Sequence, residues 1–219
     1  METNHNPNAR ELRHESSDEL EQLALREVLR RKPLGDGVRT LVIPGGHGDF
    51  ALQLASDGAL VTVIDEPRFI QEIEQRAKSS KLSANLVGAE GSLAALPEEP
   101  PGAPYDIVFC RRGFCRLPYA SSVLTLRQLL RQTKIGGKLY VSVLGLHSEL
   151  GDDYPGAEQD VTDRFCPLSP VMAEKYGIHD PVCLYSERNL FMLALEAGGS
   201  VLRTFTTTHG NVRAVIVRV

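Results

Sequence analysis

Three glycines, Gly45, Gly46 and Gly48, stand close together after a short apolar run. Residues 39–43 have the composition of a buried strand, and residues 51–55 continue as the apolar side of a helix. A glycine turn lets a ligand approach the backbone closely, and the helix after it offers unpaired N–H groups and a positive dipole end. The pattern predicts a site for a carboxylate or phosphate. The alternative is that the glycines only form a tight turn.

An acidic pair follows the next apolar run. Residues 60–64 are predicted to be a strand, and Asp65 and Glu66 come directly after it. An acid at this place in a strand–turn–helix–strand unit accepts hydrogen bonds from ribose hydroxyls. Asp65 is the first candidate, and Glu66 can take the role instead. The alternative for Asp65 is a solvated residue that caps the helix beginning at Pro67.

Helices and strands alternate along the rest of the chain, which predicts a parallel sheet with helices on both faces. A capping box at Ser16 and Glu19 predicts a first helix that ends at Pro33. The last two predicted strands, residues 201–207 and 212–217, are too close together for a crossover, so the final strand must run antiparallel. The expected fold is an α/β, Rossmann-like three-layer sandwich with a seven-stranded, mostly parallel sheet and an antiparallel C-terminal strand. Further elements are expected as strands at 84–87, 106–110 and 138–144, a helix from Pro118 that Gly136 and Gly137 stop, a helix after Ser186, and a proline-rich loop at 91–104.

The length of 219 residues suits one sizeable core. Residues 1–15 are polar and are expected to form a flexible lead, followed by a single domain at 16–219. Within that domain, residues about 147–185 are irregular, mostly polar and longer than a usual connection. Such segments often cover binding sites, so this insertion is expected to lie over the substrate.

Charge and composition exclude several classes. A net charge of −4 disfavours a nucleic-acid partner, even though Arg111, Arg112 and Arg116 form a local basic cluster. No apolar stretch approaches the length that spans a bilayer, and the N-terminus lacks an apolar signal core, so we expect a cytoplasmic protein without a membrane partner. The cysteines form no CxxC pair, which predicts free thiols and no metal site. Cys110 lies in an apolar run and is expected to be buried.

Four segments carry a family resemblance. Residues 41–51 (LVIPGGHGDFA) resemble the first motif of class I S-adenosylmethionine-dependent methyltransferases, and residues 105–111 (YDIVFCR) resemble that family's fourth-strand motif. Residues 114–118 and 129–139 are similar to the segment after that strand and to the helix-to-fifth-strand signature. The resemblance spans about residues 38–145. The proline before the glycines is similar to the thiopurine, thiol and tellurite methyltransferase group.

The resemblance implies S-adenosylmethionine as the cofactor. It implies that the glycine turn faces the methionine part and that Asp65 holds the ribose. It also implies that Glu90, or Ser92 beside it, lies near the adenine, and that the end of the fourth strand contacts the methionine part through its backbone. The cofactor-binding residues expected on this basis are Pro44, Gly45, Gly46, Gly48, Asp49, Asp65, Glu66, Glu90, Gly91, Cys110 and Arg111.

The chain departs from the family pattern at two positions. Val42 stands where many members carry an acid that touches the amino-acid end of the cofactor, and Pro44 stands at the usual first glycine. Asp49 is the candidate replacement for the missing acid. These departures motivate the alternative function, a catalytically silent methyltransferase fold that binds or regulates. The terminal strand pair argues against the third candidate, a nicotinamide-dependent oxidoreductase.

The expected activity is methyl transfer to a small-molecule acceptor. Displacement at a sulfonium depends mainly on holding donor and acceptor in line, so the chemistry forces no catalytic residue. Where the acceptor carries a proton, His147 is the first candidate base, with an exposed loop histidine as the alternative. Tyr154, Cys166 and His179 are weaker candidates. Acidic side chains in the insertion could suit an amine substrate or a metal, or simply form a solvated loop. Acceptor and oligomeric state stay open.

Overall fold

The computed structural model describes residues 19–34 and 37–219. The expected lead at 1–15 and the capping residue Ser16 lie outside these residues. The elements in chain order are α2 (Glu19–Arg31), η1 (Lys32–Leu34), β1 (Arg39–Val42), α3 (Asp49–Ser56), β2 (Leu60–Asp65), α4 (Pro67–Ser79), β3 (Leu86–Glu90), β4 (Tyr105–Arg111), η2 (Phe114–Arg116), α5 (Tyr119–Arg131), β5 (Thr133–Val143), η3 (Glu149–Gly151), α6 (Pro170–Tyr176), α7 (Glu187–Glu196), β6 (Ser200–Thr206) and β7 (Val212–Val217).

One seven-stranded sheet has the order β3-β2-β1-β4-β5-β7-β6. Strands β1 to β5 pair in parallel, and β7 runs antiparallel to both β5 and β6. This topology confirms the predicted sandwich. Some boundaries differ from the expectation. The strand predicted at 84–87 is β3 at Leu86–Glu90. Helix α5 ends at Arg131, and Gly136 and Gly137 do not stop it but lie inside β5, which begins at Thr133 and whose pairing with β4 shifts register.

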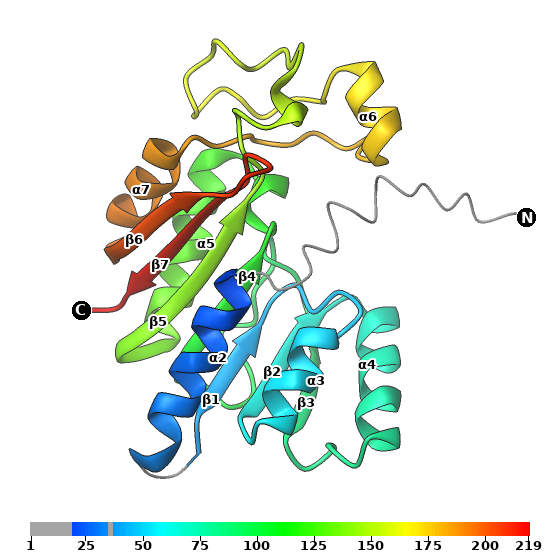
Figure 1. The fold of residues 1–219 in the computed structure, drawn as a ribbon, viewed down its shortest axis with the longest axis vertical. Helices are drawn as coiled ribbons and strands as arrows, with labels where there is room; N and C mark the ends of the chain where they lie inside the picture. The colour runs from blue at the N-terminus through cyan, green and yellow to red at the C-terminus, as the bar shows by residue number, and fades with distance from the viewer. Residues whose placement is uncertain (1–18, 35–36) are drawn as a thin grey trace, which may run out of the picture.

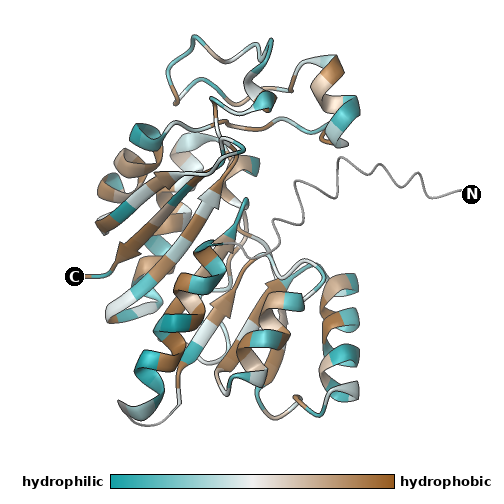
Figure 2. Cartoon of the chain, viewed as in Figure 1, coloured by the Kyte–Doolittle hydropathy of each residue, from teal (hydrophilic) through white to brown (hydrophobic). Residues whose placement is uncertain are grey.

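Two helical layers cover the sheet (Figure 1). Side chains alternate along each strand, so neighbours on β1 enter different cores: Val42 packs with α2, α3 and α4, whereas Leu41 packs with α5 and α7. Figure 2 shows the strands as the most apolar part of the ribbon, as expected for a sheet buried on both faces. Within the described part of the chain, no helix is long and apolar enough to cross a membrane.

The crossover from β3 to β4 is the predicted proline-rich loop and contains no helix. Its carbonyl groups accept hydrogen bonds from side chains of β2, of β4 and of the residue that follows α5. Thr62 Oγ1 and Tyr105 Oη each donate to Pro101 O at 2.7 Å, and Gln132 Nε2 donates to Pro97 O at 2.8 Å. These bonds replace the backbone ladder that a crossover helix would have supplied, so the loop is fixed without regular structure.

The insertion at 147–185 contributes side chains to the buried core, although its composition is mostly polar. Its side chains Leu150, Tyr154 and Val182 are buried and belong to the core on the α5 side. Arg164, only 6% exposed, organises it: the guanidinium donates to the carbonyls of Gly156, Gln159 and Leu184 at 2.7–3.1 Å and to Asn189 Oδ1 at 2.9 Å.

The two ends of the insertion meet at the sheet. Gly145 and Tyr185 form an isolated parallel bridge, with Tyr185 N donating to Leu144 O at 2.9 Å and Leu146 N donating to Tyr185 O at 2.8 Å. The insertion therefore leaves and rejoins the core at one place above β5.

An ion cluster joins α2 to the sheet. Glu27 is 5% exposed and accepts hydrogen bonds from Arg30, Arg31 and Lys138, the last at 2.9 Å from β5. Burial by itself raises the pKa of Glu27, but the hydrogen bonds from Arg30, Arg31 and Lys138 more than offset it and lower the pKa from 4.5 to about 2. The ionised carboxylate is therefore part of the folded state.

Replacing Glu27 by glutamine is expected to lower the free energy of unfolding at pH 7 by about 2 kcal/mol. Because the folded-state pKa lies below the ordinary value, the wild-type advantage is present above pH 4.5 and is lost as the pH falls toward about 2. Urea unfolding at a series of pH values measures the difference, with Glu99→Gln on the exposed crossover loop as the control. A difference that does not change over this pH range would contradict the assignment.

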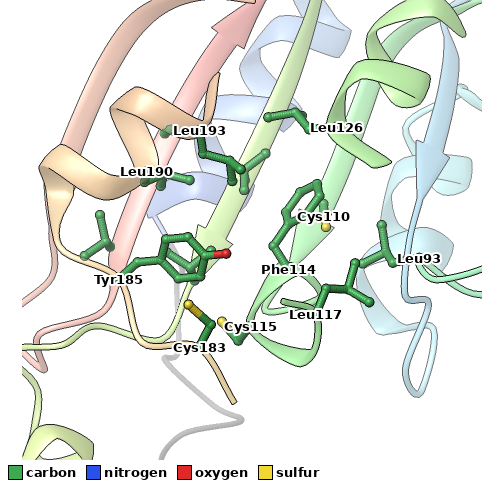
Figure 3. Close-up of a cluster of buried hydrophobic side chains, with 14 of the residues drawn as sticks. Leu93, Cys110, Phe114, Cys115, Leu117, Leu126, Cys183, Tyr185, Leu190 and Leu193 are labelled. Carbon is green, nitrogen blue, oxygen red and sulfur yellow. The ribbon is translucent and has the colours of Figure 1, made fainter. Parts of the chain in front are cut away.

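Three of the four cysteines are buried, as predicted for Cys110, and all four are free thiols. Cys115 and Cys183 lie side by side beneath Tyr185 (Figure 3), and Cys183 N donates to Cys115 O at 2.8 Å. Burial raises the pKa of the Cys115 thiol to about 12 and that of Cys183 to about 11, and it raises the pKa of Cys110 as well. Cys166 is only half-buried.

Iodoacetamide at pH 8 is therefore expected to modify Cys166 in the folded protein and to leave the three buried cysteines unmodified, because the reactive species is the accessible thiolate. Intact mass measurement should show one adduct under native conditions and four after unfolding in urea. Rapid formation of two or more adducts on the native protein would show that the core around Tyr185 opens readily.

Candidate functional site

Most of the predicted cofactor-binding residues lie at the carboxyl ends of four parallel strands, β1 to β4. The turn after β1, Asp65 at the end of β2, Glu90 at the end of β3 and Arg111 at the end of β4 lie along one edge of the sheet. Asp65 and Glu90 are direct partners in the β2–β3 register. In open α/β sheets, ligands bind outside this edge, where the order of strands reverses, and here that point lies between β1 and β4.

The three glycines of the turn serve different purposes. A Cβ on Gly45 would lie 2.2 Å from Val63 Cγ1, and one on Gly48 would lie 2.6 Å from Ile73 Cγ1, so both positions are explained by close packing on β2 and α4. Gly46 has a φ of 57°, and a Cβ there would meet nothing within 4 Å. The backbone is therefore open to a ligand at Gly46 alone among the three.

Asp65 lies against this turn. Its side chain is buried, with 8% of the residue exposed; Oδ2 accepts from Gly46 N and Oδ1 from Glu66 N, both at 2.8 Å. A carboxylate has about four acceptor positions, so each oxygen keeps one for a further donor. Glu66 is exposed and pairs with Arg68 at 3.2 Å. Of the acidic pair, Asp65 is the residue that contacts the glycine turn.

Arg76 of α4 binds two residues at the end of the glycine turn, His47 and Asp49. Its guanidinium donates to the carbonyl oxygen of His47 and contacts Asp49 Oδ1 at 2.6 Å. Asp49 opens α3 and is exposed, but this ion pair engages its carboxylate. Val42 is buried in the core on the α2 side. Val42 has no carboxylate and that of Asp49 is paired, so neither residue offers a free carboxylate beside the turn. Pro44 is exposed and follows a cis peptide bond.

The remaining predicted residues border the same edge. Glu90 is exposed and Gly91 N donates to Asp65 O at 3.1 Å. Cys110 is fully buried, and the Arg111 side chain turns away to contact Glu21 of α2, so only their backbones could serve a ligand. Gly113 was not among the predicted residues. A Cβ there would lie 1.8 Å from Leu93 Cδ1 and would clash with this side chain, which Figure 3 shows in the buried cluster.

Strained backbone marks the residue that follows β4. Arg112 has a φ of 54°, which is uncommon for a residue with a side chain, and its N–H donates to Ser142 O at 2.8 Å. The hydrogen bond to Ser142 holds the chain close to β5 as it leaves the edge. Such strained positions cluster at functional sites.

His147 does not lie in this group. It is exposed in the loop after β5 and lines a separate cavity near the β6–β7 turn. The weaker base candidates have structural surroundings: Tyr154 is buried and its hydroxyl donates to Val182 O at 2.6 Å, Cys166 pairs with Val182, and His179 is exposed. Among the described residues, no group of three or more potential ligands is placed to hold a metal ion.

No protein-family model and no curated protein matches the chain. Solved structures match its fold. The chain is similar to an S-adenosylmethionine-dependent methyltransferase from Methanosarcina mazei with a TM-score of 0.64 and 18% identity, covering 87% of this chain and 97% of that one. It is similar to the S-adenosylmethionine-dependent methyltransferase SibL with a TM-score of 0.61 and 18% identity over 90% of this chain and 55% of that one.

A third similar structure is the [4+2]-cyclase SpnF, with a TM-score of 0.60 and 20% identity over 87% of this chain. The chain spans 55% of the length of SibL and 60% of that of SpnF. At these identities the likeness establishes the methyltransferase Rossmann-like fold. The thiopurine, thiol and tellurite group does not appear among these structures.

The donor set at the edge fits an adenosyl cofactor in two respects. Asp65 keeps acceptor positions for the two hydroxyls of a ribose, and Gly46 leaves room beside the N-terminal turn of α3, whose N–H groups suit a carboxylate. In one respect the fit is incomplete, since Val42 is apolar and Asp49 pairs with Arg76, so no carboxylate of this turn is left for a ligand's ammonium group.

Alanine substitutions should separate the roles of neighbouring glycines. Gly45→Ala is expected to lower the free energy of unfolding by about 3 kcal/mol, because its methyl group overlaps the buried Val63. Gly46→Ala should cost only about 1 kcal/mol, the penalty for a left-handed residue in open space. Chemical denaturation measures both. Equal losses would mean that the turn does not lie against β2 as described.

Proposed function

We propose that this protein transfers a methyl group from S-adenosylmethionine to a small-molecule acceptor. The observation that carries the proposal is the contact between Asp65 and Gly46: a carboxylate with spare acceptor positions lies against an open glycine backbone. This pair stands at the carboxyl edge of a sheet whose fold matches S-adenosylmethionine-dependent methyltransferases.

Each end of the cofactor has a group on the chain to hold it. Asp65 would accept hydrogen bonds from the ribose hydroxyls, and the N-terminal turn of α3 beside Gly46 would hold the methionine carboxylate. Glu90 and Gly91 would border the adenine, and the backbones of Cys110 and Arg111 would face the methionine part. When bound, S-adenosylmethionine supplies an activated methyl group on a sulfonium.

The acceptor side needs positioning more than covalent help. A methyl acceptor held in line with the donor gains most of its acceleration from orientation. His147 would take the proton from an acceptor that carries one, as its imidazole is exposed in the loop that follows β5. The insertion at 147–185, fixed by Arg164, would cover the acceptor and exclude water.

A second candidate function is supported by the region around Val42. No carboxylate of the glycine turn is left for a cofactor ammonium group, because Val42 is buried and Arg76 engages Asp49. A domain of this kind could bind a ligand without transferring a methyl group. One similar structure carries the name of a cyclase, so the fold is not confined to proteins named as methyltransferases.

Titration with S-adenosylhomocysteine by calorimetry tests the main proposal. Asp65→Asn should raise the dissociation constant by about 30-fold, because two hydroxyl hydrogen bonds to a charged acceptor contribute about 2 kcal/mol together. Asp57→Asn, at the C-terminal end of α3 on the opposite edge of the sheet, is the matched control and should leave the constant unchanged.

Thermal unfolding of both variants checks that the asparagine at 65 has not simply loosened the turn. If the wild type shows no saturable binding, or if both variants bind equally well, the cofactor does not use this edge. The second candidate function would then account better for the fold.

A further inference from the structure

Strand β6 forms one end of the sheet, and no strand of the described chain pairs with its outer edge (Figure 1). The strand runs for seven residues without a proline or a lysine, and Arg203 is its single charged residue. Proteins usually protect an edge of this length, because the free backbone groups of an edge attract another strand. Within β6 itself the one protective device is a bulge near its start, between Val201 and Arg203.

The regular part of β6 presents the backbone of two residues to this edge. Just beyond the strand, Thr207 N donates to Asn211 O at 2.8 Å, which sets the pattern of the ladder with β7. Backbone groups of successive residues point to opposite sides of a strand, so those of Phe205 face β7 and those of Thr204 and Thr206 point outward. These outward groups form a template for one more antiparallel strand.

An apolar flank of α7 lies beside the same edge. Glu187 accepts a hydrogen bond from Thr206 Oγ1 of β6 at 2.5 Å, whereas Glu196 faces α5, so the contacts identify the two sides of the helix. Phe191 and Leu195 follow Glu187 at intervals of four residues and therefore lie on the β6 side. Phe191 is 39% exposed and Leu195 is 45% exposed, at positions where a solvated helix carries polar residues.

An occupant of this edge must match a strand and a helix flank together. A twofold axis perpendicular to the sheet would pair β6 antiparallel with its own copy and would keep both α7 helices on one face of the joined sheet. With the axis at Phe205, Thr204 and Thr206 of one copy exchange hydrogen bonds with Thr206 and Thr204 of the other, and the two Phe205 side chains become cross-strand neighbours. Phe191 of each copy then approaches Phe191 of the other. A second copy of this chain therefore supplies both parts by symmetry.

Charge and size also suit a second copy. Arg203 is paired with Glu19 at 3.0 Å, and in this register it stands opposite Thr207 instead of another arginine. A strand of seven residues is about 24 Å long and the sheet with one helical layer is about 20 Å thick, so the contact covers about 500 Å² of each copy. The total of about 1,000 Å² is near the lower limit for a specific interface, which predicts dissociation in the micromolar range.

We propose that this protein forms a twofold-symmetric dimer in which β6 pairs with β6 and α7 packs against α7. The two sheets become one continuous sheet, and the flank formed by Phe191 and Leu195 is buried between the copies. The interface does not involve the proposed cofactor site, because β4, β5 and β7 separate β6 from β1 in the sheet. Dimer formation and binding of S-adenosylhomocysteine are therefore independent results.

Sedimentation velocity of the full chain across the micromolar range tests for the dimer. The average mass should rise from that of one chain toward that of two as the concentration increases. Phe191→Glu should raise the dissociation constant at least about tenfold, because two carboxylates would meet across the axis. Leu124→Glu is the matched control: this leucine is 62% exposed on the neighbouring helix α5, and its replacement should leave the constant unchanged.

A second variant tests the strand without altering the helix. Thr204→Pro removes an N–H that points outward, and the hydrogen bonds of the ladder with β7 remain. It should also raise the dissociation constant at least about tenfold, since the ring blocks the edge. Thermal unfolding of dilute samples checks that the monomer of each variant is still folded.

Amide hydrogen exchange followed by NMR locates the interface. In dilute protein, Thr204 and Thr206 should exchange faster than Phe205, which β7 protects, and raising the concentration should slow the exchange of these two threonines selectively. The mass of one chain at every concentration would overturn the proposal. A dimer that leaves both threonines in fast exchange, or that Phe191→Glu does not weaken, would overturn it as well.

Discussion

Three strand ends are joined at Asp65, and the arrangement of the edge depends on that junction. Its side chain accepts from Gly46 N in the turn after β1, and its own carbonyl accepts from Gly91 N where β3 ends. Gly45 completes the contact by resting on Val63 of β2. A residue that holds the first, second and third strands in register cannot be moved without disturbing the turn, so any ligand site here inherits a fixed frame.

The carboxyl edge divides into two halves with different chemistry. On the β1–β4 side, backbone amides and one buried carboxylate face the edge, and this suits a nucleoside with an acidic tail. On the β5–β7 side, hydroxyls, imidazoles and an amide surround a cavity with little net charge. The strained Arg112, bonded to Ser142 of β5, stands where the two halves meet. The carboxyl edge therefore offers two chemically distinct surfaces, one on each side of this junction.

Features of the fold that depend on local periodicity and spacing could be predicted from the sequence. The strand–turn–helix unit around Gly46, the acid at the end of β2 and the antiparallel final strand were all predicted from spacing and composition, and the sheet confirmed them. The roles within the turn were not predictable. Gly45 is needed because of Val63, 18 positions away, and Asp49 is engaged by Arg76, 27 positions away. Such contacts exist only once the fold has assembled. The buried contacts inside the insertion were not predictable for the same reason, since Arg164 gains its partners only through tertiary packing.

The closed base of the insertion has a consequence for how the protein can change. Because Gly145 and Tyr185 pair directly, the two ends of the insertion are held side by side at the sheet whatever lies between them. The entropy of closing a loop grows slowly with its length, and the closure here is made at the core. The segment can therefore change in length and surface sequence, provided that it keeps the side chains it contributes to the core, such as Leu150, Tyr154 and Val182, while the glycine turn and Asp65 stay as they are. Variation in what the protein recognises would then be concentrated in about forty residues, on an otherwise constant scaffold.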